Sequence, residues 1–214
     1  MSRSAVQRRI SGLYGIADAD ASGGDPERIA RAMLEGGCRL IQLRCKNWLI
    51  QDILRVARTI APRCRAVDAT LILNDHPEIV AESGAHGVHL GQLDPATETA
   101  RALLPPGALI GRSTNDLNQI AQALLDLDYV AFGPVFSTEN AGRPKTVRGV
   151  EYLAHARSLV PWHVPLVAIG GIDAALLPAV RQTGVSAWAV IGAITKATDP
   201  VAATRALLGT PGLA

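Results

Sequence analysis

Residues 166–172 read Leu-Val-Ala-Ile-Gly-Gly-Ile, and residues 187–194 read Ala-Trp-Ala-Val-Ile-Gly-Ala-Ile. Each stretch is a short apolar run that ends in glycine, a pattern typical of a strand buried on both faces and followed by a tight turn. Similar runs recur from the start of the chain, and segments with helical periodicity separate them. The strand candidates are Leu13–Ala17, Leu40–Leu43, Thr70–Leu73, Gly87–Leu90, Leu109–Gly111, Tyr129–Phe132, Leu166–Ile169 and Ala187–Ile191.

The segments between these runs carry helix-start signals. Asp25, Asp94 and Asp199 each precede a proline, which is the order expected for an N-cap residue followed by the first helical position. The sequence therefore predicts that each aspartate caps a helix. The helix candidates include Pro26–Glu35, Leu49–Ala61, Pro95–Leu104, Leu117–Leu125 and Val150–Leu159.

Continuous repetition of strand and helix predicts an α/β protein with a parallel sheet, either closed or open. An open doubly wound sheet would more naturally carry a glycine fingerprint after its first strand, but residues 14–18 read Tyr-Gly-Ile-Ala-Asp. Eight units in 214 residues favour a closed (β/α)8 barrel, the TIM-barrel architecture. We expect residues 1–214 to form one barrel domain, with residues 1–10 as a mobile N-terminal extension.

Composition excludes several classes of protein. The 214 residues include 21 Lys+Arg and 19 Asp+Glu, a net charge of +2, and aromatic residues supply only 4%, so nucleic-acid binding through bulk charge or base stacking is not expected. The apolar stretch 185–194 is too short to span a membrane. Cys38, Cys45 and Cys64 form no paired framework, which predicts reduced thiols and a cytoplasmic location.

Polar residues follow the second predicted strand, where residues 42–46 read Gln-Leu-Arg-Cys-Lys. Because side chains alternate along a strand, Gln42, Arg44 and Lys46 share one side. In a barrel of this kind, chemistry occurs at the carboxyl ends of the strands, so an amide, a guanidinium and an ammonium would meet there. That combination suits a dianionic group. The alternative is an ordinary solvated strand end.

Carboxylates follow the next two strands. Asn74 and Asp75 end the third strand, and residues 88–94 read Val-His-Leu-Gly-Gln-Leu-Asp, which places His89 and Asp94 at the end of the fourth. Two carboxylates from separate loops, completed by phosphate oxygens and water, match the usual environment of Mg²⁺. We therefore predict a Mg²⁺ cofactor held by Asp75 and Asp94. Helix capping is the alternative role for both aspartates.

The last two strands end in glycine. Gly170, Gly171 and Gly192 would let backbone N–H groups approach a phosphate, and the loops after strands seven and eight are a frequent phosphate site in this fold. The alternative is that these glycines only relieve crowding at a turn. Ser113 follows the fifth strand without the pattern of a nucleophile elbow, so covalent serine catalysis is not expected. The two anion sites suggest transfer between two phosphorylated small molecules.

Six motifs in this order make the chain resemble the thiamine-phosphate synthase (thiamine-phosphate pyrophosphorylase) family over nearly its whole length. That family is a (β/α)8 barrel whose members join hydroxymethylpyrimidine diphosphate to thiazole phosphate and release diphosphate, with Mg²⁺, by a dissociative mechanism. The motifs are Gln42-Leu43-Arg44-x-Lys46, Asn74-Asp75, His89-Leu90-Gly91-Gln92-x-Asp94, Gly111-x-Ser113-Thr114, Gly133-Pro134-Val135-Phe136-x-Thr138 and Ile169-Gly170-Gly171-Ile172.

The resemblance implies a role for each site residue. Arg44, Lys46 and Ser113 would be catalytic. The pyrimidine diphosphate would be held by Arg44 and Lys46 together with Gln42, Asn74, His89, Ser113 and Thr138. Gly170, Gly171 and the backbone near Gly192 would receive the thiazole phosphate, and Asp75 and Asp94 would bind Mg²⁺. The partners would be these two small molecules, with a homo-oligomer left open.

The chain departs from the family pattern in its sixth loop. A diphosphate-binding lysine is expected where the chain has Ala141, and we expect Arg143 or Lys145 to replace it. Asn115 stands where the family commonly has histidine. Two alternatives stay open: a thiazole tautomerase-like enzyme, which would need that histidine, and a phosphate-ligand-binding barrel without turnover.

Overall fold

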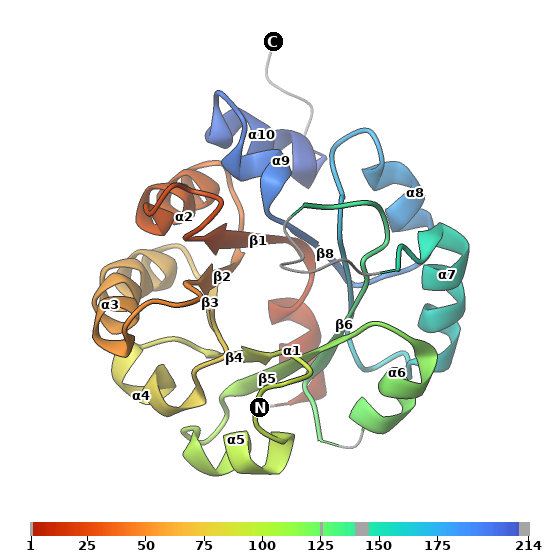
Figure 1. Ribbon diagram of the computed structural model, residues 1–214, viewed down its shortest axis with the longest axis horizontal. Helices are drawn as coiled ribbons and strands as arrows, with labels where there is room; N and C mark the ends of the chain where they lie inside the picture. Colours follow the sequence, from red (N-terminus) through yellow and green to blue (C-terminus); the bar gives the residue numbers. More distant parts are fainter. Residues whose placement is uncertain (1, 125, 140–145, 210–214) are drawn as a thin grey trace.

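The protein is a closed barrel of eight parallel strands in sequence order, each hydrogen-bonded to the next and the last to the first (Figure 1). The computed structural model describes residues 2–124, 126–139 and 146–209. The predicted (β/α)8 architecture is confirmed. The strands are β1 (Gly12–Asp18), β2 (Leu40–Arg44), β3 (Thr70–Asn74), β4 (Gly87–Leu90), β5 (Leu109–Thr114), β6 (Tyr129–Phe132), β7 (Leu166–Ile169) and β8 (Ala187–Val190).

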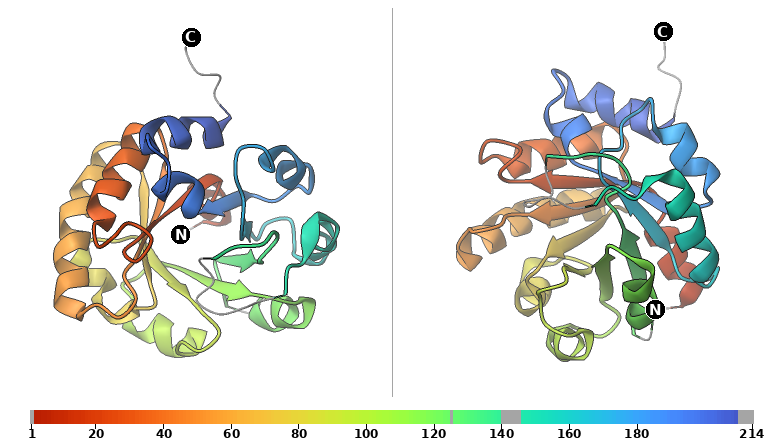
Figure 2. Two further views of the ribbon diagram at one scale, coloured as in Figure 1. Left: turned by 45° about the horizontal axis from the view of Figure 1, so that its top comes forward. Right: turned by 45° about the vertical axis from the view of Figure 1, so that its right-hand side comes forward.

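Helices surround the barrel and leave its strands in the centre (Figures 1 and 2). The observed bounds lie close to the predicted ones, and α2 has the predicted bounds. Within the described residues the helices are α1 (Arg3–Arg9), α2 (Pro26–Glu35), α3 (Ile50–Ala66), the short 3-10 helix η1 (Pro77–Ile79), α4 (Val80–Ser83), α5 (Thr97–Leu103), α6 (Leu117–Ala123), α7 (Gly149–Leu159), α8 (Leu177–Gln182), α9 (Gly192–Thr195) and α10 (Pro200–Leu208).

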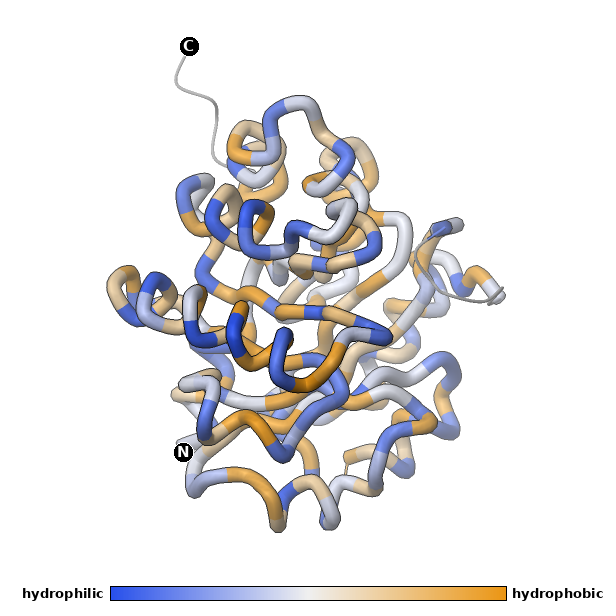
Figure 3. Tube along the Cα trace, turned by 60° about the vertical axis from the view of Figure 1, so that its left-hand side comes forward, coloured by the Kyte–Doolittle hydropathy of each residue, from blue (hydrophilic) through white to orange (hydrophobic). Residues whose placement is uncertain are grey.

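The core has two layers. The larger layer lies between the strands and the outer helices, and it contains the strand side chains that point outward, such as Leu43 and Leu71. The smaller layer fills the barrel, with Tyr14, Leu40 and Tyr129 among its members. Hydrophobic and hydrophilic residues alternate along the outer helices in Figure 3, as expected for helices that bury one face against a sheet.

The N-terminal segment, for which we expect mobility, is helical in this structure and packs against the barrel. Residues 3–9 form α1, which Figure 1 shows behind the barrel, on the side away from the tips of the strand arrows. Val6 and Ile10 are buried in the inner core layer. Two apolar residues four positions apart lie on one face of a helix, so α1 closes the barrel at the amino ends of its strands.

Two of the three predicted helix caps are confirmed. Asp25 accepts a hydrogen bond from the backbone N–H of Arg28, and Asp199 accepts from two backbone N–H groups at the start of α10. The cap predicted for Asp94 is wrong, because α5 begins at Thr97 and its N-cap residue is Ala96. The Asp94 carboxylate instead folds back onto its own loop.

Candidate active site at the barrel mouth

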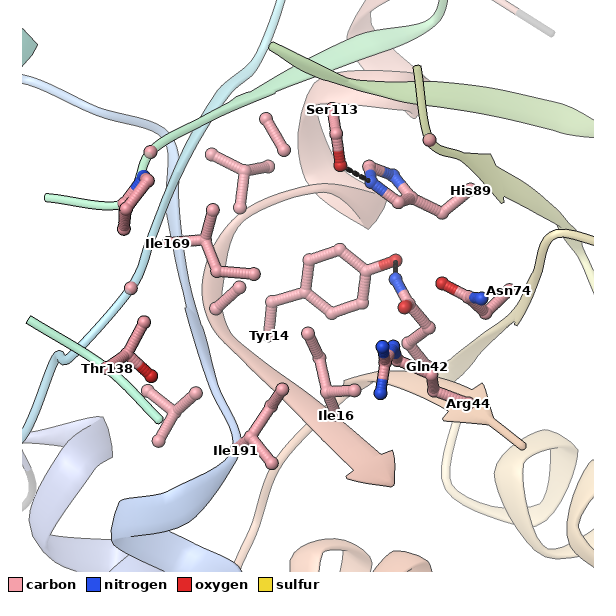
Figure 4. A pocket seen from close by; sticks show the side chains of 18 of the residues that line it. Tyr14, Ile16, Gln42, Arg44, Asn74, His89, Ser113, Thr138, Ile169 and Ile191 are labelled. Atoms are coloured by element: carbon pink, nitrogen blue, oxygen red, sulfur yellow. Dashed lines mark hydrogen bonds between the residues drawn. The ribbon is translucent and has the colours of Figure 1, made fainter. Parts of the chain in front are cut away.

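A single cavity of about 980 Å³ opens at the carboxyl ends of the strands. Figure 4 shows polar side chains from β2, β3, β4 and β5 on one side of it and apolar side chains such as Ile169 and Ile191 on the other. The structure brings every predicted site residue to this cavity. These are Gln42, Arg44, Lys46, Asn74, Asp75, His89, Asp94, Ser113, Thr138, Gly170, Gly171 and Gly192.

Arg44 ends β2 and is held by an aspartate on the neighbouring strand. Asp18 ends β1 directly beside it in the parallel register, and its carboxylate accepts a hydrogen bond from the guanidinium. Asp18 is only 2% exposed, and its other oxygen accepts from the backbone N–H of Ala21 at 2.8 Å. The guanidinium is thereby fixed in orientation while its remaining N–H groups stay available to a ligand.

Lys46 and the two predicted metal ligands lie next to this arginine. The Lys46 Nζ is 3.9 Å from the Asp75 carboxylate, and half of the Lys46 side chain is exposed. Asp75 follows β3 with a left-handed backbone (φ 68°), a conformation that aspartate tolerates better than most residues. Its backbone N–H donates to the His89 carbonyl at 2.9 Å, which fixes the turn against β4.

The side chains of Asp75 and Asp94 contact each other. Burial, followed by the hydrogen bond and charge of Asp94, raises the pKa of Asp75 to about 6, and Lys46 and Arg44 only partly oppose this. One oxygen of Asp94 also accepts from the Gly91 backbone N–H at 2.5 Å. Neither aspartate acts as a side-chain cap on the helix that follows it. Two carboxylates are thus held together where their mutual repulsion has to be offset by a proton or a cation.

This donor set fits Mg²⁺. Among the described residues there is no group of three or more His, Cys, Asp or Glu side chains that could hold a metal on protein ligands alone. Mg²⁺ commonly uses one or two carboxylates and takes its other ligands from water and substrate phosphates. The paired aspartates therefore suit an ion that arrives with a phosphorylated ligand better than a closed structural metal site.

His89 and Ser113 form part of the cavity floor. The Ser113 Oγ lies 2.9 Å from His89 Nε2 (Figure 4). His89 Nδ1 lies 3.1 Å from the hydroxyl of Tyr129. His89 is 6% exposed, and burial lowers its pKa to about 4. A neutral imidazole with both nitrogens engaged orients its neighbours and does not act as a strong base at neutral pH.

The glycines on the opposite side of the cavity allow close backbone packing. Gly171 has φ +63°, and a Cβ atom there would lie 2.3 Å from the carbonyl oxygen of Ser137. The loop after β6 therefore runs against the end of β7, and Phe136 N–H donates to the Gly170 carbonyl at 2.9 Å. Relief of crowding, the alternative offered above, accounts for Gly171. Gly192, at the start of α9, also lines the cavity.

Sequence reasoning missed several residues of the site. Asp18 could have been found by the rule that residues at carboxyl ends of strands face the mouth. Tyr14 lines the cavity, and no pattern in the sequence distinguishes it from an ordinary core tyrosine. Lys196 Nζ donates to a carboxylate oxygen of Glu139 at 2.8 Å, and both residues line the cavity, which joins the loops after β6 and β8.

The chain departs from the family pattern at Ala141 and at Asn115, and the structure describes only the second of these positions. Ala141 and its expected replacements, Arg143 and Lys145, lie outside the described residues. Asn115 lines the cavity, and its carbonyl accepts a hydrogen bond from Arg148 Nε at 2.6 Å, so position 115 contributes an amide and a backbone contact rather than an imidazole.

A barrel with fixed cations beside paired carboxylates on one side of its mouth, and glycines after its last two strands, is typical of (β/α)8 proteins that bind phosphorylated small molecules. The chain belongs to the thiamine monophosphate synthase family, whose sequence profile matches residues 13–194. The family predicted from the six motifs is therefore confirmed.

Individual relatives agree along nearly the whole chain. Thiamine-phosphate synthase of Laribacter hongkongensis is 37% identical over 94% of this chain and 95% of its own length. The protein of the same name from Salinibacter ruber is 38% identical over 82% of this chain and 77% of its own. The solved structure of thiamine phosphate pyrophosphorylase from Pyrococcus furiosus superposes with a TM-score of 0.84 at 32% identity, covering 94% of this chain and 95% of that one.

In the part of the chain that the structure describes, none of the helices has the length and apolar character needed to cross a membrane.

Proposed function

We propose that this protein is a Mg²⁺-dependent transferase that joins hydroxymethylpyrimidine diphosphate to thiazole phosphate, forming thiamine phosphate and releasing diphosphate. The observation that carries the proposal is the cluster of Arg44, Lys46, Asp75 and Asp94 in the cavity of a chain that belongs to the thiamine monophosphate synthase family. We place the reaction in the cytoplasm, in keeping with three cysteines that are buried and unpaired.

The leaving diphosphate is the part of the reaction that most needs stabilisation. Arg44, held by Asp18, and Lys46 donate charged hydrogen bonds to its oxygens, and these bonds strengthen as negative charge develops on the leaving group. Asp75 and Asp94 hold Mg²⁺, which neutralises further charge on the diphosphate. Asn74 adds a neutral donor beside them, and Thr138 reaches the same ligand from the opposite loop.

The pyrimidine half lies over the floor of the cavity, against Gln42, His89 and Ser113. Departure of diphosphate leaves a cation on this half, stabilised by its own ring, and the nitrogen of the thiazole then attacks it. The backbone at Gly170, Gly171 and Gly192 receives the thiazole phosphate. No protein nucleophile and no strong base are required, which agrees with a His89 that stays neutral. Catalysis consists of positioning and charge stabilisation.

Two other functions make different predictions for the same experiment. The purified protein is incubated with both phosphorylated substrates and Mg²⁺, and thiamine phosphate and diphosphate are measured. Formation of both in equal amounts supports the transferase. Tight binding of the pyrimidine diphosphate without product would indicate a binding barrel. Isomerisation of a thiazole phosphate alone would indicate a tautomerase, a reaction for which Asn115 supplies no imidazole.

A matched pair of variants tests whether the cavity is the site of reaction. Arg44→Ala removes a cation from the cavity, whereas Arg55→Ala removes an arginine whose side chain is 69% exposed on α3. We expect the first to reduce product formation strongly and the second to leave it unchanged. Equal activities in the two variants would place the reaction elsewhere.

A further inference from the structure

A continuous chain of hydrogen bonds crosses the inside of the barrel beneath the cavity. Gln42 Nε2 donates to the Tyr14 hydroxyl at 2.9 Å, and the hydroxyls of Tyr14 and Tyr129 lie 2.9 Å apart. Tyr129 OH lies 3.1 Å from His89 Nδ1, and His89 Nε2 lies 2.9 Å from Ser113 Oγ. We call these five residues the interior relay. Both of its ends, Gln42 and Ser113, line the cavity.

The relay is largely buried, although Tyr14 and His89 line the cavity as well as the two ends. Gln42, Tyr14 and Tyr129 are each 2% exposed or less, and His89 is 6% exposed. In the described part of the chain, the side-chain hydroxyl of each tyrosine bonds only to other members of the relay. Because each tyrosine hydroxyl has its hydrogen-bond partners within the relay, its proton points along the relay in one direction or the other.

The Gln42 amide sets that direction. Its N–H donates to the Tyr14 oxygen, so among the described residues the single Tyr14 proton has only Tyr129 as an acceptor, and the Tyr129 proton then points to His89 Nδ1. His89 Nδ1 accepts the Tyr129 proton and therefore carries none of its own. The one imidazole proton is then on Nε2 and points to Ser113.

We propose that Tyr14 and Tyr129 are positioning residues that hold His89 in its Nε2–H tautomer and thereby make the Ser113 hydroxyl a hydrogen-bond donor toward the ligand. Ser113 Oγ already accepts from His89, so its own proton is directed into the cavity. It therefore selects a ligand with an acceptor at that position. The identification of this acceptor as a ring nitrogen of the pyrimidine rests on the proposed function. The direction of the hydrogen bonds in the relay does not depend on that function.

Two observations set Tyr129 apart from a residue that only fills space. It is absent from the described residues that line the cavity, so its effect on a ligand passes through its hydrogen-bond partners His89 and Tyr14, which do line it. Its ring also needs an empty position on the neighbouring strand: a Cβ atom at Gly111 would lie 2.0 Å from the Tyr129 Cζ. The ring stacks on His89 with centroids 5.5 Å apart, which aligns the hydroxyl of one with the nitrogen of the other.

The tautomer of His89 is measured from the ¹⁵N shifts of its ring in the free protein at neutral pH. We expect a protonated Nε2 and an unprotonated Nδ1 in the wild type. Gln42→Glu reverses the relay, because a carboxylate accepts a hydrogen bond from Tyr14 and cannot donate one. With the new carboxyl shown to be ionised by its ¹³C shift, we expect the proton to move to Nδ1, although position 42 does not touch His89.

Two further variants keep the test independent of whether Gln42→Glu folds. Tyr14→Phe removes a hydroxyl that is two hydrogen bonds away from His89, and it should give a mixture of the two His89 tautomers. Ser113→Ala removes the far end of the relay and should leave Nε2 protonated. A wild-type proton on Nδ1, or an unchanged His89 in both Gln42→Glu and Tyr14→Phe, overturns the proposal.

Kinetics add a second readout for Tyr129. We expect Tyr129→Phe to raise the KM for the pyrimidine diphosphate on the order of tenfold with a smaller change in kcat, the loss of one aligned hydrogen bond in the ground state. Because the ¹⁵N measurement needs no turnover, the two proposals fail separately. If the His89 tautomer responds to the substitutions as expected but the protein forms no thiamine phosphate, the relay is supported and the proposed function is refuted.

Discussion

Acid pH should destabilise the protein through His89. Burial lowers the pKa of this histidine to about 4 in the folded protein, from about 6.5 in the unfolded chain. Between these two pH values the unfolded state binds more protons than the folded state. The stability contributed by keeping His89 neutral is therefore fully present above about pH 6.5 and is lost as the pH falls toward 4.

The size of the effect follows from the gap between the two pKa values. Over the whole window the gap corresponds to about 3 kcal/mol in the free energy of unfolding. Most of this loss falls between pH 7 and pH 5, where the expected decrease is about 2 kcal/mol. For a domain of this size, that decrease lowers Tm by roughly 4–8 °C.

Urea unfolding of the wild type and of His89→Gln at pH 7, 6 and 5 measures this contribution. Glutamine keeps a donor and an acceptor but does not titrate, so the variant should lose about 2 kcal/mol less than the wild type between pH 7 and pH 5. The pKa of His86 is also lowered by burial, and its effect cancels in the comparison. Equal pH dependence in the two proteins, or an NMR titration midpoint for His89 near 6.5, would refute the reasoning.

Four further substitutions test other parts of the site. Asp75→Asn and Asp94→Asn should each remove most Mg²⁺-dependent product formation at saturating substrate, because each deletes a carboxylate ligand; full activity in either contradicts the metal assignment. Asp18→Asn removes the buried carboxylate that pairs with Arg44 and should lower the free energy of unfolding by about 3 kcal/mol, measured by urea unfolding. The control is Asp52→Asn, which breaks an exposed ion pair with Arg55 and should change that free energy by less than about 1 kcal/mol. Gly171→Ala forces a Cβ atom against a carbonyl oxygen 2.3 Å away and should cost about 1–3 kcal/mol in thermal unfolding; an unchanged Tm would show that the loop moves aside freely.

The barrel could be predicted from sequence because its signals are local. Buried parallel strands are continuous apolar runs, and Asp25 followed by Pro26 marks the start of α2 with both its cap and its first position. The positions of Arg44, Lys46, Asp75 and Asp94 also follow from local order, since each stands just after a strand whose end faces the mouth.

The errors arose where the deciding contact is not local. Asp94 precedes a proline as a cap would, but its carboxylate bonds to the N–H of Gly91, and the helix starts later. The first ten residues lack a long periodic pattern because α1 has only seven residues, and only the closed barrel gives Val6 a surface to cover. Tyr14 and Tyr129 are 115 positions apart and meet only because strands β1 and β6 enclose the same interior.

Because the ring of Tyr129 occupies the space that Gly111 leaves open, the residue allowed at each of these two positions depends on the residue at the other. As long as a tyrosine occupies position 129, any side chain at position 111 collides with its ring. Without that ring, a glycine at position 111 is no longer required. Homologues should therefore change both positions together or neither. A designer who wishes to repack the inside of this barrel has to change residues 111 and 129 together, in a single step.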